Sequence, residues 1–293
     1  MAATGAALEG GARGIETRRS EAVSLLTPCV TLWIGPSLGT VERACLKSVL
    51  RQGHSLALYC YSAPHGVPAG VEVRDAAEIL PENRIIRHRT GSVALFANWF
   101  RYELQRRGLG TWVDTDAYLL KPLESEKPYL MGEEGPGRIN NGLLRVPRDS
   151  PLLPPLLALF EELSVPHWLP LRAKAAAWWR LKTSGRSGLA QMPWGSAGPL
   201  ALTALARQHG VAQLAEPPEV LYPIRWQDAD WIQNPAVRLE SVITERTASI
   251  HLWNERIKAF KDAPAPPGSF LARLQTEGAP DAAQPPLPKV ASA

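Results

Sequence analysis

The sequence predicts an α/β fold in which a mostly parallel sheet is flanked by helices. Two short apolar runs, CVTLWI at residues 29–34 and SLALYCYS at residues 55–62, have the length and the β-branched and aromatic content of buried strands. Between them, TVERACLKSVLRQG at residues 40–53 carries apolar residues at helical spacing and ends at Gly53. A strand, a helix and a strand in about thirty residues form a βαβ unit, and apolar strands of this kind belong to parallel sheets covered on both faces.

A second predicted helix and strand lead to a pair of carboxylates. The run SVALFANWFRYELQRRG at residues 92–108 has helical periodicity and ends at Gly108. TWV at residues 111–113 then predicts a strand that runs directly into Asp114 and Asp116. Because ligands of open α/β sheets bind beyond the carboxyl ends of the strands, these two aspartates are candidate site residues.

Composition divides the chain into three parts. Residues 1–27 are small and polar and are predicted to be a flexible leader, and residues 28–262 carry the apolar periodicity of a folded domain. Residues 263–293 contain many prolines among Ala, Gly and Gln. Such a segment buries too little apolar surface to offset its ordering entropy, so we expect a disordered tail.

The charge of the chain favours small anionic ligands over nucleic acid. The formal net charge is +4 and the pI is about 9.0. The sequence has no long Lys/Arg block and no zinc-binding spacing, so we expect no nucleic-acid partner.

The cysteines and the hydropathy pattern predict a cytoplasmic location. Cys29, Cys45 and Cys60 are widely spaced and odd in number, which favours buried, reduced thiols over a disulfide framework. No run of about 18 apolar residues is present to span a membrane, and residues 1–27 lack the apolar core of a signal peptide.

The Asp-Thr-Asp at residues 114–116 has the chemistry of a metal clamp. In extended backbone Asp114 and Asp116 point to the same side, and two like charges held together need a cation or a proton between them. Mg²⁺ typically takes one or two protein carboxylates together with substrate phosphates. The alternative is a polar turn capped by two aspartates. A second such pair, Asp228 and Asp230, has no apolar strand before it and is predicted to lie in a surface loop.

The wider context resembles a known group of enzymes. FANWFRYELQRRGLGTWVDTDAYLLKPL is similar to the sugar-binding region of Asp-x-Asp glycosyltransferases: an Arg-Tyr helix, a Gly-containing turn, an apolar strand, Asp-x-Asp and a short run to Lys-Pro. INNGLLRVP, PWGSAGPLALT and IHLWNE resemble later segments of the same group, in the same order. Over residues 29–258 the chain resembles glycosyltransferase family 32 and the related capsular-polysaccharide and α-1,4-glycosyltransferases. The resemblance implies the type-A glycosyltransferase fold, a Rossmann-like, mostly parallel sheet flanked by helices.

The resemblance also implies roles for particular residues. Asp114, Asp116 and His251 would bind Mn²⁺ or Mg²⁺, and an imidazole ligand suits Mn²⁺ better. The implied nucleotide-sugar-binding residues are Trp33, Asn98, Arg101, Tyr102, Asp114, Asn140 and Asn141. The implied catalytic residues are Asp114, Asp116, Arg101 and Asn141. Gly198, Pro199 and Thr203 resemble acceptor-side scaffold.

Each of these assignments has a structural alternative. A lone His251 is commonly a buried histidine satisfied by hydrogen bonds, and Arg101 could be a surface helix arginine. Asn140 and Asn141 precede a glycine, and Asn-Asn-Gly is also good turn sequence. The chain departs from the family at Ala97-Asn98, where relatives often carry Ser-Asp, so the aspartate charge near the nucleotide is missing.

The resemblance therefore implies transfer of a hexose from a nucleotide-sugar, a UDP-sugar, to a glycan or lipid-linked acceptor, with retention at the anomeric carbon. The same residues are compatible with two other functions. A metal-dependent phosphohydrolase would need ligands for a second ion, for which Glu133 and Glu134 are the nearby candidates. A catalytically silent nucleotide- or carbohydrate-binding module would use the same residues without turnover.

Residues 167–186, HWLPLRAKAAAWWRLKTSGR, interleave basic residues with tryptophans and contain no acids. Such a helix could rest on an anionic membrane at its inner face or grip a lipid-linked acceptor. The alternative is an ordinary helix whose tryptophans face the core.

Overall fold

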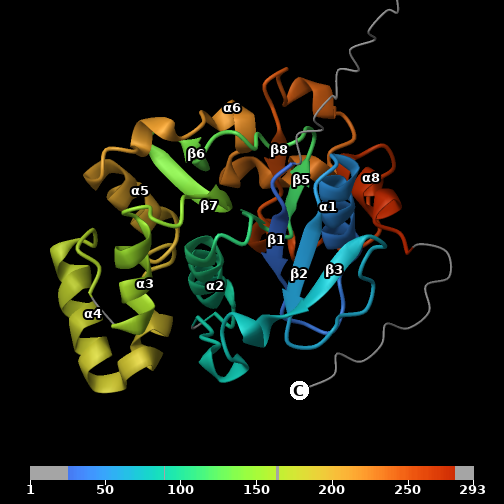
Figure 1. Cartoon of the computed structure of the whole chain (residues 1–293). Coiled ribbons are helices and arrows are strands. Elements are labelled where there is room, and N and C mark those ends of the chain that lie inside the picture. Colours follow the sequence, from blue (N-terminus) through green and yellow to red (C-terminus); the bar gives the residue numbers. More distant parts are fainter. Residues whose placement is uncertain (1–25, 89, 163–164, 281–293) are drawn as a thin grey trace, which may run out of the picture.

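The computed structural model describes residues 26–88, 90–162 and 165–280 (Figure 1). The fold is mixed α/β, with a six-stranded, mostly parallel sheet flanked by helices, and is compatible with a Rossmann-like fold. The sheet strands are β1 (Cys29–Leu32), β2 (Leu56–Cys60), β3 (Val71–Asp75), β4 (Thr111–Val113), β6 (Leu130–Gly135) and β7 (Arg138–Arg145). The predicted βαβ unit and the predicted strand at 111–113 are confirmed, with β1 ending two residues earlier than its apolar run.

The strand order of the sheet creates a crevice beside β4. The order is β3-β2-β1-β4-β7-β6, so the chain moves outward from β1 to β3 and then returns to place β4 on the other side of β1. β1, β2, β3 and β4 are parallel, whereas β7 runs antiparallel to both β4 and β6. The switch in order between β1 and β4 is the point at which open α/β sheets bind ligands.

Helices cover both faces of this sheet. They are α1 (Thr40–Arg51), α2 (Ala94–Arg107), α3 (Leu153–Glu161), α4 (Leu171–Ser184), α5 (Pro199–Gln208), α6 (Pro218–Leu221), α7 (Asn254–Ile257) and α8 (Phe270–Glu277). Helix α2 ends at Gly108, whose left-handed φ of 66° closes the helix as its sequence predicts.

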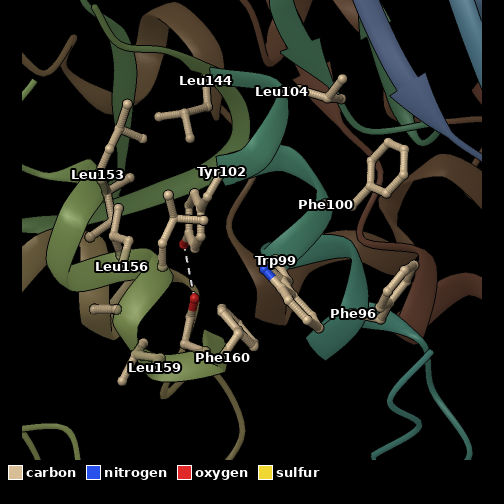
Figure 2. Packing of buried hydrophobic residues seen from close by; sticks show 14 of the residues in the cluster. Phe96, Trp99, Phe100, Tyr102, Leu104, Leu144, Leu153, Leu156, Leu159 and Phe160 are labelled. Atoms are coloured by element: carbon tan, nitrogen blue, oxygen red, sulfur yellow. Dashed lines mark hydrogen bonds between the residues drawn. The ribbon is translucent and has the colours of Figure 1, made fainter. Parts of the chain in front are cut away.

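The two faces of the sheet bury separate apolar clusters. Because successive strand residues point to opposite faces, Trp112 packs with α2 and α3 whereas Val113 packs with α1 and α8. On the first face the rings of Trp99 and Phe160 stack at 5.4 Å and join α2 to α3 (Figure 2). Helix α2 is therefore fixed against β4, next to the candidate carboxylates.

A second, two-stranded sheet extends from β4. It pairs β5 (Ala117–Leu119) with β8 (Ser249–His251) in antiparallel register. Residue His251 lies opposite Ala117, so a segment far along the chain is brought beside the Asp-Thr-Asp.

The predicted boundary of the folded domain at residue 262 is wrong, because residues 263–280 form part of it. Phe270, Leu271 and Leu274 on one face of α8 are buried, and the Phe270 ring stacks on Trp231 at 5.1 Å. Pro264, Pro266 and Pro267 precede α8 and Pro280 follows it, so none of them interrupts the helix. Ser269 caps the first turn by accepting from the N–H of Ala272. The predicted leader up to residue 25 and the tail from residue 281 lie outside the described residues.

Two further expectations concern thiols and membrane spans. Cys29, Cys45 and Cys60 are all buried and unpaired, and burial raises the pKa of the Cys60 thiol to about 11. Within the described part of the chain, no helix combines the length and apolarity needed to cross a bilayer.

Candidate functional site

The two carboxylates lie in a tight turn at the switch point of the sheet. Asp114 follows β4 directly, and the N–H of Ala117 donates to the carbonyl of Asp114 at 3.0 Å. The predicted extended backbone is therefore wrong at residues 114–116. The turn nevertheless directs both carboxylates toward the imidazole of His251.

Asp114, Asp116 and His251 converge. Nε2 of His251 lies 3.4 Å from Oδ2 of Asp114 and 3.5 Å from Oδ1 of Asp116. One ligand atom from each residue lies within 4.8 Å of the other two, and each side chain is mostly buried. The structure thus brings together the three residues that the sequence analysis assigned to a metal.

Backbone pairing supplies the position of His251. The β5–β8 register places it opposite Ala117, and the N–H of Leu252 donates to the carbonyl of Asp116 at 2.9 Å. Trp253 then adopts a left-handed φ of 59°, which is uncommon for a residue other than glycine. This turn allows the N–H of Asn254 to donate to Oδ2 of Asp116 at 2.7 Å, so one short segment fixes two of the three side chains.

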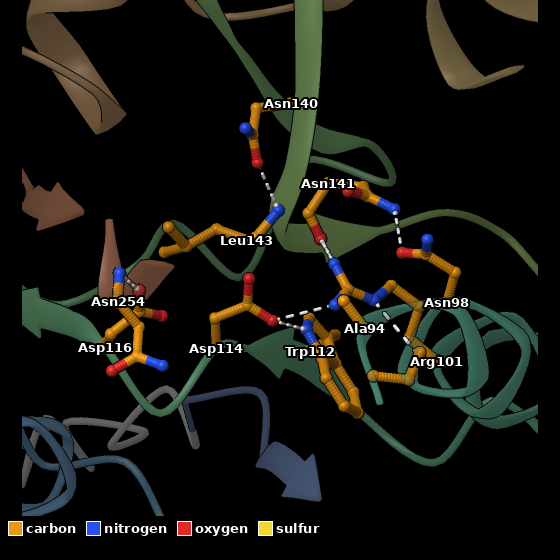
Figure 3. A network of polar contacts seen from close by, with 12 residues as sticks. Ala94, Asn98, Arg101, Trp112, Asp114, Asp116, Asn140, Asn141, Leu143 and Asn254 are labelled. Atoms are coloured by element: carbon orange, nitrogen blue, oxygen red, sulfur yellow. Dashed lines mark hydrogen bonds and ion pairs between the residues drawn. The ribbon is translucent and has the colours of Figure 1, made fainter. Parts of the chain in front are cut away.

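Helix α2 and strand β4 fix the side chain of Asp114. The guanidinium of Arg101 donates from Nη2 to Oδ1 of Asp114 at 2.9 Å, and the indole Nε1 of Trp112 donates to the same oxygen at 2.7 Å (Figure 3). The guanidinium also lies over the Trp112 ring, 4.6 Å from its centroid. Oδ1 of Asp114 is thus occupied by two donors, and Oδ2 faces His251.

Charges around the site favour an ionised Asp114. Burial alone would raise the pKa of Asp114, but Arg101 and the His251 hydrogen bond outweigh it and hold that pKa below its usual range. Burial would lower the pKa of His251, but Asp116 and Asp114 outweigh it and raise that pKa. A proton on Nε2 of His251 would partly neutralise the neighbouring carboxylates, so a divalent ion would compete with that proton.

The donor set fits a divalent metal. Two carboxylate oxygens and one imidazole nitrogen are ligands that Mn²⁺ accepts, whereas Mg²⁺ prefers an all-oxygen set. The backbone leaves room beside them: a Cβ added at Gly142 would lie 2.9 Å from both Oδ2 of Asp114 and Nε2 of His251. A side chain at this position would occupy the space in front of the ligand atoms.

Amide side chains line the cavity above the three residues. Asn98 comes from α2, and Asn140 and Asn141 come from β7. The Nδ2 of Asn141 donates to Oδ1 of Asn98 and to the hydroxyl of Tyr102, both at 3.0 Å. Oδ1 of Asn140 accepts from the N–H of Gly142 at 2.7 Å.

Two structural alternatives from the sequence are excluded. Asn140 and Asn141 lie inside β7, so the Asn-Asn-Gly does not form a turn. Arg101 is buried and uses three of its N–H groups within the protein, on Asp114 and on the carbonyls of Ala97 and Asn141, so it is not a surface arginine. Its contacts make it a residue that positions Asp114.

Two predicted ligand-binding residues do not reach the cavity. Tyr102 is fully buried behind Asn141 and donates to the carbonyl of Ala197 at 2.9 Å. Trp33 follows β1 and packs against the α1 side of the sheet, away from the residues that line the cavity. Tyr102 therefore contacts Asn141, which lines the cavity, and does not line the cavity itself.

Other predicted residues have structural roles. Pro199 begins α5 and lines the cavity, whereas the Thr203 hydroxyl accepts from the N–H of Ile139 at 2.9 Å and so joins α5 to β7. A Cβ at Gly198 would lie 3.0 Å from Nδ2 of Asn98, so this glycine allows close approach to an amide of the site.

The second Asp-x-Asp lies apart from these residues. Asp228 and Asp230 are exposed on a 3-10 helix, Trp226–Gln233, not on the predicted loop.

Sequence reasoning missed several residues that shape the site. Trp112 and Asp114 are two positions apart across a strand end, which could have indicated that Trp112 approaches the carboxylate. Gly142, Trp253 and Asn254 gave no local signal, because their contributions come from backbone shape and a backbone N–H.

Comparison of the chain with models of known protein families returns no match. Comparison with curated proteins likewise returns no match.

Proposed function

We propose that the protein is a metal-dependent glycosyltransferase with the type-A fold. It transfers a hexose from a nucleotide-sugar, a UDP-sugar, to a glycan or glycolipid acceptor. The observation that carries this proposal is the convergence of Asp114, Asp116 and His251 within 4.8 Å of one another, beneath a cavity at the switch point of the sheet. The resemblance to family 32 glycosyltransferases gives the same three residues as metal ligands.

In this proposal Asp114, Asp116 and His251 hold Mn²⁺ or Mg²⁺. A cation bound there supplies positive charge to the diphosphate of the leaving nucleotide, where negative charge builds as the glycosidic bond breaks. Arg101 and Trp112 keep Asp114 ionised and leave its Oδ2 directed at the site. These contacts are made by protein groups alone, so the orientation of Asp114 does not depend on substrate groups.

The amides of the cavity orient the donor sugar. Asn98, Asn140 and Asn141 lie on two elements that meet above the carboxylates, and an amide both donates to and accepts from sugar hydroxyls. Asn98 stands where family members often carry an aspartate. It offers hydrogen bonds without adding a negative charge to those of Asp114 and Asp116.

The outer part of the cavity suits an acceptor sugar. Trp194 and Trp226 line the cavity and are 47% and 39% exposed, respectively. Sugar rings present apolar C–H faces, and an exposed indole buries such a face while hydroxyl groups stay solvated. Retention at the anomeric carbon follows from the family resemblance, and we assign no nucleophile.

The phosphohydrolase alternative fits less well. It needs a second group of metal ligands, and the residues described in the structure contain one such group of three. The nearby candidates are engaged elsewhere, because Glu134 pairs with Arg138 and with Asn140, and Glu133 accepts from the N–H of Gly137.

The test combines binding with turnover. Titration calorimetry of UDP should give binding in Mn²⁺ that is lost in EDTA, and a screen of UDP-sugars should identify one whose UDP is released. Asp116→Asn should abolish both signals. The matched control is Asp228→Asn, which changes an exposed aspartate of the second Asp-x-Asp.

The outcomes separate the candidates. Mn²⁺-dependent UDP binding without release from any UDP-sugar would favour the silent binding module, and release of inorganic phosphate would favour the phosphohydrolase. Full turnover in Asp116→Asn would overturn the proposal.

A further inference from the structure

Helix α4 exposes an unusually apolar outer face. Leu171, Trp178 and Trp179 are 82%, 53% and 64% exposed. The opposite face holds the helix to the core through Ala177 and Leu181, which are buried. The alternative that the tryptophans of α4 face the core is therefore wrong, because the structure turns both of them to solvent.

Basic residues frame this apolar face. Leu171, Trp178 and Lys182 are seven and four positions apart and share one side of the helix, and Arg172 is exposed beside them. Nζ of Lys182 lies 6.0 Å from the centroid of the Trp178 ring, so the basic group and the indole share one part of the surface. The sequence has no acidic residue from position 163 to position 215, so no carboxylate of this stretch offsets the charge.

We propose that α4 is a docking surface for an anionic lipid membrane. Tryptophan and leucine side chains enter the boundary between headgroups and acyl chains, while lysine and arginine remain at the level of the lipid phosphates. The positive charge of this face favours an anionic membrane as its partner. A second copy of the chain would bring the same positive, acid-free face against itself, because a two-fold contact is made by identical surfaces.

The position of α4 connects this surface to the cavity. The chain leaves α4 through the 3-10 helix Gly185–Gln191, and the next residues, Met192 to Ala197, form a wall of the cavity. Trp168, before α4, donates from Nε1 to the carbonyl of Ser196 in the same wall at 2.9 Å. The membrane contact of α4 is inferred from the exposure and charge of this helix alone. Delivery of a lipid-linked acceptor to the cavity would be its purpose, and this part of the inference rests on the proposed function.

The test is co-sedimentation of the full chain with vesicles, without metal or nucleotide. We expect binding to vesicles of phosphatidylglycerol and phosphatidylcholine and much weaker binding to phosphatidylcholine alone. Arg172→Glu/Lys182→Glu should weaken binding to the anionic vesicles by about tenfold or more, because each basic residue near the surface adds to the attraction. Trp178→Ala/Trp179→Ala should weaken it through loss of apolar insertion.

Control variants make the result specific. Arg74→Glu/Arg238→Glu changes the net charge equally at residues that pair with acids elsewhere on the surface, and should keep most of the binding. Far-ultraviolet circular dichroism is used to check that each variant is folded. Release of UDP from a UDP-sugar, measured in solution, reports the proposed function separately from docking.

Three results would overturn the proposal. They are absence of binding to anionic vesicles, equal loss in the α4 and control variants, and a dimer in solution that Trp178→Ala/Trp179→Ala dissociates. The last result would assign the face to a second copy of the chain.

Discussion

Nη2 of Arg101 donates to Oδ1 of Asp114 at 2.9 Å, and this ion pair joins α2 to the end of β4. The side chain of Arg101 is 6% exposed, so water and salt screen this ion pair only weakly. Asp114 is thereby held with its second oxygen toward His251. The orientation of one candidate metal ligand depends on a residue thirteen positions earlier in the chain.

The first prediction concerns Arg101→Lys. Lysine keeps the charge but lacks the planar fork that reaches Asp114, Asn141 and the Trp112 ring together. We expect affinity for Mn²⁺ with UDP to fall by about 10- to 100-fold, as is usual when an orienting partner of a metal ligand is lost. Calorimetry measures the change. Arg106→Lys, on the exposed side of the same helix, is the control, and equal affinities in the two variants would contradict the role of Arg101.

The strands that the sequence predicts are those with continuous apolar character. β1, β2 and β4 lie in the middle of the sheet and are buried on both faces, so their residues show the pattern directly. β3 is a partly exposed edge strand, and β5 and β8 form a separate two-stranded sheet that depends on pairing between distant segments. β7 carries Asn-Asn-Gly, whose local turn preference is overridden by pairing with β4 and β6.

The sequence predicts the site unevenly. Asp114 and Asp116 are recognisable because they follow an apolar strand, whereas His251 lies 137 residues from Asp114 and was assigned through a resemblance of motifs. No local pattern reports which distant strand will pair with β5. For Trp33 and Tyr102 the resemblance predicts contact with the ligand, and neither residue lines the cavity. A motif indicates the region in which a side chain lies but not the direction in which it points.

A second prediction concerns the space in front of the ligand atoms. Gly142→Ala places a methyl group 2.9 Å from Oδ2 of Asp114 and Nε2 of His251. We expect Mn²⁺ affinity to fall at least about tenfold, because correct geometry at a metal site requires ligands free to approach the ion. Gly135→Ala, where nothing lies within 4 Å of the added Cβ, should bind Mn²⁺ as the wild type does. Normal Mn²⁺ affinity in Gly142→Ala would show that the cation does not bind between Asp114 and His251.

A third prediction separates a positioning role from direct contact. Tyr102→Phe removes the hydroxyl that donates to Ala197 and accepts from Asn141, and leaves the buried carbonyl without that donor. We expect a loss of about 1–3 kcal/mol in the free energy of unfolding, measured by urea denaturation. KM for the donor should rise as Asn141 loses one of its two partners. A change in KM without any loss of stability would instead indicate that Tyr102 touches the substrate.

A fourth prediction tests the corrected domain boundary. Removal of residues 265–293 deletes α8 and with it the buried Phe270, Leu271 and Leu274. Each buried apolar side chain contributes roughly 1.5–3 kcal/mol, so the deletion should remove much of the stability of a domain and lower its Tm sharply. Removal of residues 281–293 leaves the described contacts of α8 in place and should leave Tm unchanged. Equal Tm values for the two truncations would restore the boundary predicted at residue 262.

A fifth prediction concerns the pH dependence of stability through His54. Its ring is buried between two backbone groups: Nδ1 donates to the carbonyl of Thr27 at 3.0 Å, and Nε2 accepts from the N–H of Leu123 at 2.9 Å. This arrangement requires a neutral ring, since a proton on Nε2 would face another donor. Burial, with a smaller contribution from Arg145, lowers the pKa of His54 below its ordinary value of 6.5.

The sign of the effect follows from linkage. The unfolded chain takes up the proton near pH 6.5 and the folded chain does so at lower pH, so the contribution of His54 is complete above pH 6.5 and declines as the pH falls. The slope attributable to one group is at most about 1.4 kcal/mol per pH unit. His54→Gln cannot titrate, yet its side-chain oxygen can accept from Leu123, so its urea midpoint should fall less than that of the wild type between neutral and mildly acidic pH. His209→Gln, at an exposed position, should keep the wild-type slope. Parallel curves for His54→Gln and wild type would show that another group sets the acid sensitivity of the fold.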